Sequence, residues 1–244
     1  MAEPSLFANR RGQLIPVVVP LTVIPLDVAQ KAVQYSPFTQ WLNGVEERYD
    51  VRSITFQSID MFGSRVGFIK FEAEVYDRTT GERMSGIIFM RGGSVGILVI
   101  LECEGAEYAL LAVQPRIATG EFAFTEILAG MLDGSGNFVG VAAKELKEEA
   151  GPDFAIGEKD LLALTAPDRP IFLSPGGTDE TMSLFLYRRT VTRAQLEALS
   201  GRATGELEDG ERIVLKVVPA DDLWSINDAK TLLAISLYER QNGR

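Results

Sequence analysis

The 244-residue chain contains no histidine, and this absence restricts its chemistry more than any other feature of its composition. Without an imidazole, the Ser-His and Cys-His nucleophilic pairs, His-bound zinc and a histidine general base are all excluded. Catalysis must then depend on carboxylates, Lys, Tyr or a metal ion. Hard oxygen ligands of this kind favour Mg²⁺, with Mn²⁺ as the alternative.

Cysteine, positive charge and long apolar runs are also scarce. The single cysteine, Cys103, has no internal disulfide partner, so we expect a buried thiol and a cytoplasmic or other reducing compartment. Lys and Arg number 24 against 34 Asp and Glu, and the net charge of −10 argues against nucleic acid or a membrane surface as a partner. The longest apolar stretch, 94–103, is too short to cross a bilayer, and the N-terminus lacks the apolar core of a signal peptide.

Mixed strand and helix patterns follow one another along the chain, and the 46% hydrophobic content is sufficient for one large or two small cores. Residues 14–25 are β-branched but interrupted by prolines, which predicts an edge strand or an extended arm. Gly63-Ser64 between two strand-like runs predicts a hairpin. Further strands are predicted at 84–92, 94–103, 107–114 and 182–190. Helices are predicted at 28–47, with a break at Pro37, at 137–150 and at 193–200, and a final helix is expected to be capped by Asn227.

The stretch 129–151, AGMLDGSGNFVGVAAKELKEEAG, concentrates three glutamates on one short predicted helix. Glu145 and Glu149 are four residues apart and share a face, with Glu148 beside them. Taken alone, this pattern is typical of a solvated helix, because Lys144 and Lys147 offset the repulsion between the like charges.

The spacing of residues in this stretch nevertheless resembles the Nudix box. Gly130, Lys144-Glu145, Glu148-Glu149 and Gly151 stand at its positions, with Lys144 where Arg is usual and Gly136 where the first Glu is expected. The resemblance implies a Mg²⁺ site made by Glu145, Glu148, Glu149 and the backbone carbonyl of Ala129. Such a site suits diphosphate hydrolysis, since divalent ions neutralise the phosphates and lower the pKa of a bound water.

Segments outside the box resemble the ADP-sugar diphosphatase branch of this superfamily, and the plant-type ADP-glucose/ADP-ribose enzymes in particular. Within 113–130, Arg116 and Glu126 match residues near the diphosphate, and within 174–180 the substrate loop matches at Gly177 and Glu180. The acidic segment that supplies a catalytic carboxylate in this branch offers the candidates Glu206, Glu208, Asp209 and Glu211, of which Glu211 is preferred.

Each of these features also has a simpler interpretation. Arg116 suits a surface ion pair, 174–180 suits a tight turn, and the acidic segment suits a solvated linker. The aromatic residues Phe122, Phe124, Phe172, Trp41 and Trp224 are interpreted first as packing residues.

The resemblance implies a fold and a domain organisation. We expect an α/β (α+β) protein in which residues 93–244 form a Nudix α/β/α sandwich with a mixed sheet. Residues 1–92 are expected to form a small, mainly antiparallel β domain that makes substrate contacts and pairs two subunits as a homodimer.

The function that the resemblance implies is Mg²⁺-dependent hydrolysis of ADP-ribose or ADP-glucose to AMP and a sugar phosphate. Two alternatives stay open. One is a diphosphatase for UDP-glucose or another nucleotide sugar, and the other is a Nudix-fold sensor that binds a nucleotide sugar without turnover, for which Gly136 is the motivating feature.

Overall fold

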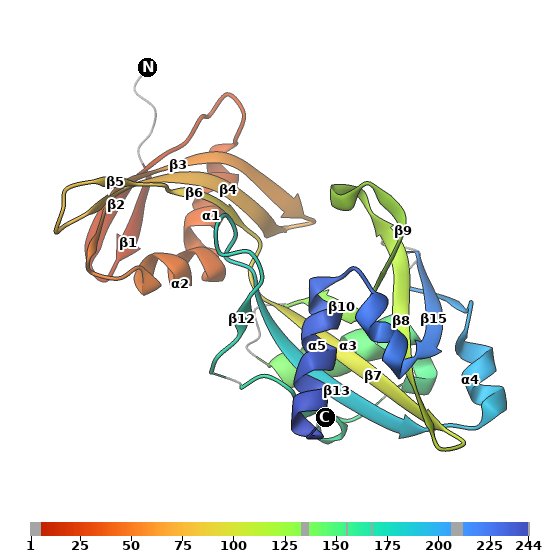
Figure 1. The fold of residues 1–244 in the computed structure, drawn as a ribbon. Helices are drawn as coiled ribbons and strands as arrows, with labels where there is room; N and C mark the ends of the chain where they lie inside the picture. The colour runs from red at the N-terminus through yellow and green to blue at the C-terminus, as the bar shows by residue number, and fades with distance from the viewer. Residues whose placement is uncertain (1–5, 133–136, 155, 167, 206–211, 244) are drawn as a thin grey trace. The chain divides into compact units, whose positions relative to one another are not determined.

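The chain divides into two compact units in the computed structural model, which describes residues 6–132, 137–154, 156–166, 168–205 and 212–243. The first unit comprises Met1–Gly92 together with Ser174–Glu180 (Figure 1). The second comprises Gly93–Leu173 and Thr181–Arg244. None of the described helices is long and apolar enough to cross a membrane.

The first unit is a twisted sheet covered by two short helices. Its strands run in the order β1-β2-β3-β4-β5, with β6 also paired to β4, and every pair is antiparallel except β2 with β3. The elements are β1 (Leu6–Arg10), β2 (Gln13–Val18), α1 (Leu26–Gln34), α2 (Ser36–Gly44), β3 (Tyr49–Phe62), β4 (Arg65–Asp77), β5 (Arg83–Met84) and β6 (Ile87–Met90).

Buried residues at alternate positions of the long strands form the core of this unit. Every second residue of β4 from Ile69 to Val75 is buried, as expected for a strand with one face against a core. Phe38 of α2 packs edge-on against Phe56 and Phe71 with ring centroids 5.5 Å apart in both pairs. Edge-on aromatic pairs of this kind contribute about 0.5–1.5 kcal/mol beyond the area that they bury.

Three sequence predictions in this unit have different outcomes. The hairpin at Gly63-Ser64 is confirmed, and the predicted helix divides into α1 and α2 with the break at Tyr35. The prediction of an edge strand at 14–25 is wrong, because β2 lies between β1 and β3. Pro16 is tolerated there because the parallel pairing with β3 begins only at Val17.

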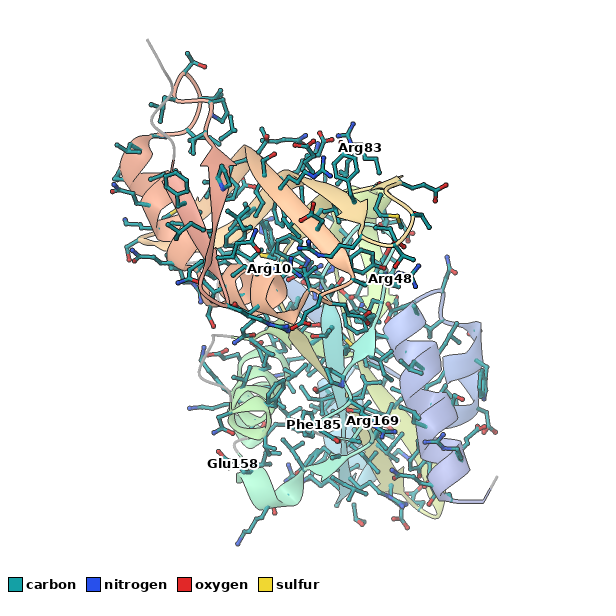
Figure 2. All side chains as sticks on the ribbon, turned by 90° about the vertical axis from the view of Figure 1, so that its left-hand side faces the viewer. Arg10, Arg48, Arg83, Glu158, Arg169 and Phe185 are labelled. Carbon is teal, nitrogen blue, oxygen red and sulfur yellow. The ribbon has the colours of Figure 1, made fainter. Side chains whose placement is uncertain are left out.

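Arg10 ties the first strand to the chain segment that follows α2. It is buried, and its guanidinium donates hydrogen bonds of 2.9 Å to the carbonyl oxygens of Val45, Glu46 and Tyr49. Figure 2 labels this side chain inside the first unit. Burial, reinforced by the positive charges of Arg78 and Arg11, lowers the pKa of Arg10. The backbone carbonyls therefore satisfy a cation that would be costly to bury unpaired.

The second unit contains a mixed sheet with strand order β11-β13-β7-β8-β15-β14. β13 and β7 are parallel, whereas β7 and β8 are antiparallel, and β9, β10 and β12 pair with β8, β7 and β13. The elements are β7 (Ser94–Cys103), β8 (Ala106–Arg116), β9 (Glu121–Glu126), β10 (Leu128–Met131), α3 (Phe138–Ala150), β11 (Leu162–Ala163), β12 (Ile171–Phe172), β13 (Thr181–Thr190), α4 (Arg193–Leu199), β14 (Ala203–Thr204), β15 (Ile213–Pro219) and α5 (Ala229–Gln241).

Side chains on the two faces of this sheet belong to two different cores. Odd-numbered residues of β7, such as Ile97 and Val99, pack with α3 and α4, whereas Leu98 and Ile100 pack with α5. Figure 2 shows α3 and α5 on opposite sides of the sheet strand that carries Phe185. The second unit is therefore an α/β/α sandwich, and its middle layer is buried on both faces as the continuous apolar run of β7 indicates.

Most elements of this unit agree with the sequence predictions. β7 has the predicted bounds, α3 begins one residue later than expected, and the Thr192–Gln195 capping box at α4 is present. Cys103 is buried, as predicted. The prediction that Asn227 caps the last helix is wrong, because Asp228 is the N-cap of α5 and accepts a hydrogen bond from the Thr231 amide at 3.0 Å.

Candidate active site

The face of helix α3 that packs on strand β10 carries both apolar side chains and a carboxylate. Asn137 caps the helix by accepting a hydrogen bond from the Gly140 amide at 3.0 Å. Leu146 and Ala150 are buried on the side that packs on the sheet, and Glu149 is buried with them at 5% exposure. A carboxylate at such a position is costly unless it is hydrogen-bonded, so its partner is informative.

One partner of Glu149 is the backbone of β10. Its Oε2 accepts a hydrogen bond of 3.0 Å from the Ala129 amide. Ala129 is paired with Gly96 of β7 in the ladder, but its amide donates to Glu149 on α3. Since the N–H and C=O of one residue in an antiparallel strand point to the same side, we expect the Ala129 carbonyl on the side of Glu149 as well.

Glu145 occupies the space that a side chain at Gly130 would need. A Cβ atom built on Gly130 would lie 1.9 Å from Cδ and 2.0 Å from Oε1 of Glu145. Two carboxylates four residues apart on α3 therefore meet two successive residues of β10. This convergence is the central geometric feature of the site.

Glu148 lies at the edge of this group. Its side chain is 26% exposed and forms an ion pair of 3.3 Å with Lys144, one turn earlier on the helix. Exposed pairs at this spacing contribute only about 0.3–0.5 kcal/mol. In the described ranges, no three His, Cys, Asp or Glu side chains are grouped closely enough to hold an ion.

Arg116 and Glu126 meet across the β8–β9 hairpin. Arg116 Nε donates to Glu126 Oε1 at 2.6 Å, next to a register shift between Gln114 and Arg116. Glu126 is 1% exposed, and its second oxygen accepts from Lys230 Nζ at 2.7 Å. Arg116 therefore does form an ion pair, but with a buried carboxylate rather than at the surface as the simpler interpretation has it, and Glu126 is the other residue that the resemblance places near the diphosphate.

Lys230 and Asp228 were not identified from the sequence. Lys230 Nζ also donates to Asp228 Oδ1 at 2.8 Å, which brings the start of α5 to the end of β9. The capping position of Asp228 was detectable from its spacing to Thr231, but Glu126 and Lys230 are 104 positions apart in the chain, which leaves no local signal for their pairing.

The two predicted residues of the 174–180 segment belong to the first unit. The Gly177 carbonyl accepts a hydrogen bond from the Phe89 amide at 2.9 Å, which joins the segment to β6. Glu180 pairs with Arg91 at 3.4 Å, and Asp179 accepts from the Arg91 amide at 2.8 Å. The segment is therefore more than a free turn, since it is fixed at the end of the first unit.

Glu206, Glu208, Asp209 and Glu211, as well as Gly136, lie outside the described residues. Phe122, Phe172 and Trp224 are 81%, 59% and 51% exposed, so the interpretation of these three rings as packing residues is wrong. Residues 121–123 of β9 are all exposed, and β12 is a two-residue strand with only a half-buried Ile171, so the rings of Phe122 and Phe172 do not lie against a core.

The chain is 40% identical over 240 residues to Nudix hydrolase 14, chloroplastic, from Arabidopsis thaliana, a match that covers 92% of this chain and 77% of that protein. It is similar in structure to a crystal structure described as an ADP compounds hydrolase, with a TM-score of 0.51 and 15% identity, covering 80% of this chain and 98% of that one. The second likeness concerns the fold alone. No family model matches the sequence.

Proposed function

Because this chain belongs to the Nudix hydrolase family, we propose that it hydrolyses the diphosphate bond of an ADP sugar, ADP-ribose or ADP-glucose, to give AMP and a sugar phosphate. The observation that carries the proposal is the convergence of Glu145 and Glu149 on Gly130 and Ala129. The choice of an ADP sugar is supported by the resemblance of 113–130 and 174–180 to ADP-sugar diphosphatases. The name of the structural neighbour, an ADP compounds hydrolase, is in keeping with it.

The donor types suit a divalent ion, although the described carboxylates are not grouped as closely as a bound ion would hold them. Glu145, Glu148, Glu149 and the Ala129 carbonyl offer only hard oxygen atoms, which Mg²⁺ prefers to nitrogen or sulfur. The position of the Glu145 carboxylate over Gly130 keeps it beside the same strand as Ala129. When bound, Mg²⁺ supplies charge neutralisation at the diphosphate and lowers the pKa of a coordinated water.

The remaining steps depend on side chains of this chain. Arg116 would stabilise negative charge on the diphosphate, since a guanidinium binds phosphate oxygens through two parallel hydrogen bonds. Glu126 orients Arg116 through the 2.6 Å contact to Nε. A carboxylate of the 206–211 segment, Glu211 first and Glu208 or Glu206 otherwise, would accept the proton of the attacking water.

The two parts of the chain have separate proposed roles. Residues 93–244 would carry the hydrolytic chemistry, and residues 1–92 would pair two subunits, with Gly177 and Glu180 contributing to substrate binding. The outer face of the β1–β2 hairpin supports the pairing, because Phe7 and Leu14 are 52% and 62% exposed there. Exposed apolar side chains grouped on one face are typical of a surface that binds a partner, here a second copy of the chain.

The proposed reaction is tested by incubating the purified chain with ADP-ribose, ADP-glucose and UDP-glucose, in Mg²⁺ and in EDTA. We expect Mg²⁺-dependent release of AMP, and a loss of roughly 100-fold or more in Glu149→Gln. The matched control is Glu197→Gln, the same change at an exposed position on α4. Preference for UDP-glucose would shift the substrate class, and tight binding without turnover of any of the three would identify a sensor.

A further inference from the structure

The Glu126 carboxylate is shared between two cations that approach it from different elements. Oε1 accepts from Nε of Arg116 on β8 at 2.6 Å, and Oε2 accepts from Nζ of Lys230 on α5 at 2.7 Å. Glu126 is 1% exposed and the Lys230 side chain 16% exposed. Both carboxylate oxygens are therefore engaged in charge-assisted hydrogen bonds inside the protein.

Asp228 holds Lys230 in place through the cap of α5. Its Oδ1 accepts from Lys230 Nζ at 2.8 Å, while its Oδ2 accepts from the amide and the hydroxyl of Thr231 at 3.0 and 2.7 Å. The Thr231 hydroxyl in turn accepts from the Ile127 amide at 3.0 Å. Since Ile127 follows Glu126 directly, the start of α5 fixes both the backbone and the side chain at the end of β9.

The charges of this group balance. Arg116 and Lys230 are positive, and Glu126 and Asp228 are negative, so no buried charge is left uncompensated. Burial acts to lower the pKa of Lys230, but the charges of Glu126 and Asp228 outweigh it and the pKa is raised. The ammonium therefore stays charged at neutral pH.

Arg116 uses only one of its donor groups in this arrangement. Its Nε is bound to Glu126, and neither terminal nitrogen has a hydrogen-bond partner in the part of the chain that the structure describes. The side chain is 41% exposed. A carboxylate and a guanidinium normally prefer a two-point contact, which would consume one of the terminal nitrogens of Arg116.

We propose that Lys230 is a positioning residue that occupies Oε2 of Glu126, restricts Arg116 to a one-point contact through Nε, and so leaves the terminal nitrogens of Arg116 open for the substrate diphosphate. The proposal rests on the proposed diphosphatase function. It assigns to α5, which follows the box helix by about 80 residues in sequence, a role in preparing the phosphate-binding donor.

The test compares Lys230→Met, Arg116→Ala and the double variant. In Lys230→Met, Oε2 is free to take a second donor from Arg116, so kcat/KM for the preferred ADP sugar should fall about tenfold, the value of one charged hydrogen bond. Arg116→Ala should then cost clearly less in the Lys230→Met background than in the wild type. Lys230→Arg, which keeps the charge, should recover part of the loss, and Lys216→Met, at an exposed lysine of β15, should have no effect.

A binding measurement separates positioning from a merely structural role. Calorimetric titration with ADP in EDTA should show the same tenfold weakening in Lys230→Met and the same non-additivity with Arg116→Ala. If Lys230→Met unfolds, Asp228→Asn replaces it, because it keeps an oxygen for the Thr231 amide while it removes the charge that holds Lys230.

The outcomes are distinguishable. A wild-type chain that hydrolyses none of the nucleotide sugars refutes the proposed function. An active wild type whose Lys230→Met and Asp228→Asn variants keep full kcat/KM, or whose losses simply add to that of Arg116→Ala, refutes the positioning role of Lys230.

Discussion

The absence of a side chain at Gly130 makes room for the carboxylate of Glu145. The Glu145 carboxylate lies where a Cβ at this position would be, so any other residue must displace it. The displaced group is the end of a flexible side chain, and the fold itself therefore tolerates the change. Substitution of Gly130 should therefore reduce function without reducing stability.

Gly130→Ala should lower hydrolysis of the preferred nucleotide sugar by roughly 100-fold, and should change the free energy of unfolding by less than about 1 kcal/mol. Steady-state kinetics and urea unfolding measure the two quantities. Gly44→Ala is the control, because a Cβ there meets no atom within 4 Å. Full activity in Gly130→Ala would mean that the reaction does not require Glu145 in its observed place.

Asp77 provides a pH-dependent contribution to stability in the first unit. Hydrogen bonds from Arg48, labelled in Figure 2, and from the Thr79 amide lower the pKa of Asp77 from 3.8 to about 2. The folded-state pKa lies below the unfolded value, so the contribution is present above pH 4 and is lost as the pH falls through 2.

Asp77→Asn should therefore lower the urea midpoint of unfolding at pH 7, and the difference from the wild type should shrink between pH 4 and pH 2. A series of urea titrations over this range measures the effect. Asp60→Asn, at an exposed position of β3, is the control and should leave the midpoint nearly unchanged throughout. A difference that stays constant down to pH 2 would contradict the assignment of the interaction to the Asp77 charge.

At the scale of elements, the capping box of α4 was predicted correctly, whereas the cap of α5 was placed one residue too early. Thr192 and Gln195 form the capping box that their spacing indicates, with the Gln195 amide donating to Thr192 Oγ1 at 3.2 Å. The predicted strand at 84–92 is divided into β5 and β6 instead. A Cβ at Gly86 would lie 1.9 Å from the Ala73 carbonyl oxygen, so this position belongs to a close backbone approach that the local pattern does not reveal.

Thr192→Ala should reduce the free energy of unfolding by about 1 kcal/mol, because it leaves amide groups at the start of α4 without their side-chain acceptor. Chemical denaturation is the appropriate measurement. Ser200→Ala, at the other end of the same helix, should cost less, and both variants should retain hydrolytic activity. A Thr192→Ala protein as stable as the wild type would show that α4 is held by packing alone.

At the scale of the whole molecule, we expect the first unit to contribute a surface for self-association. The β1–β2 face carries Phe7 and Leu14 on the side that does not pack on the core, opposite Pro16 and Asn9 in the ladder. Hydrophobic side chains on a strand pair at the edge of a sheet favour association with another chain unless they are covered.

Leu14→Asp should weaken self-association by at least about tenfold, since a buried leucine contributes roughly 1.5–3 kcal/mol. Sedimentation velocity over a range of concentrations measures the ratio of dimer to monomer. Leu162→Asp makes the same change at a leucine of the second unit that is 57% exposed, and should leave the ratio unaltered. A wild type that sediments as a monomer at all concentrations would refute the homodimer.

The sequence by itself determined the class of chemistry and most of the local structure. The absence of histidine excluded imidazole chemistry, the resemblance of 129–151 to the Nudix box implied an oxygen-only metal site, and apolar periodicity and capping residues predicted most of the main strands and helices. These properties depend on residues that are close together in the chain, so they can be read from the sequence alone.

Only the tertiary structure decided which distant residues meet. The pairing of Lys230 with Glu126, the attachment of Gly177 to β6 in the first unit, and the packing of Glu145 against Gly130 all join different elements. Such contacts are selected by the packing of the sheets and by the requirement that buried charges find partners, and neither has a local signature in the sequence.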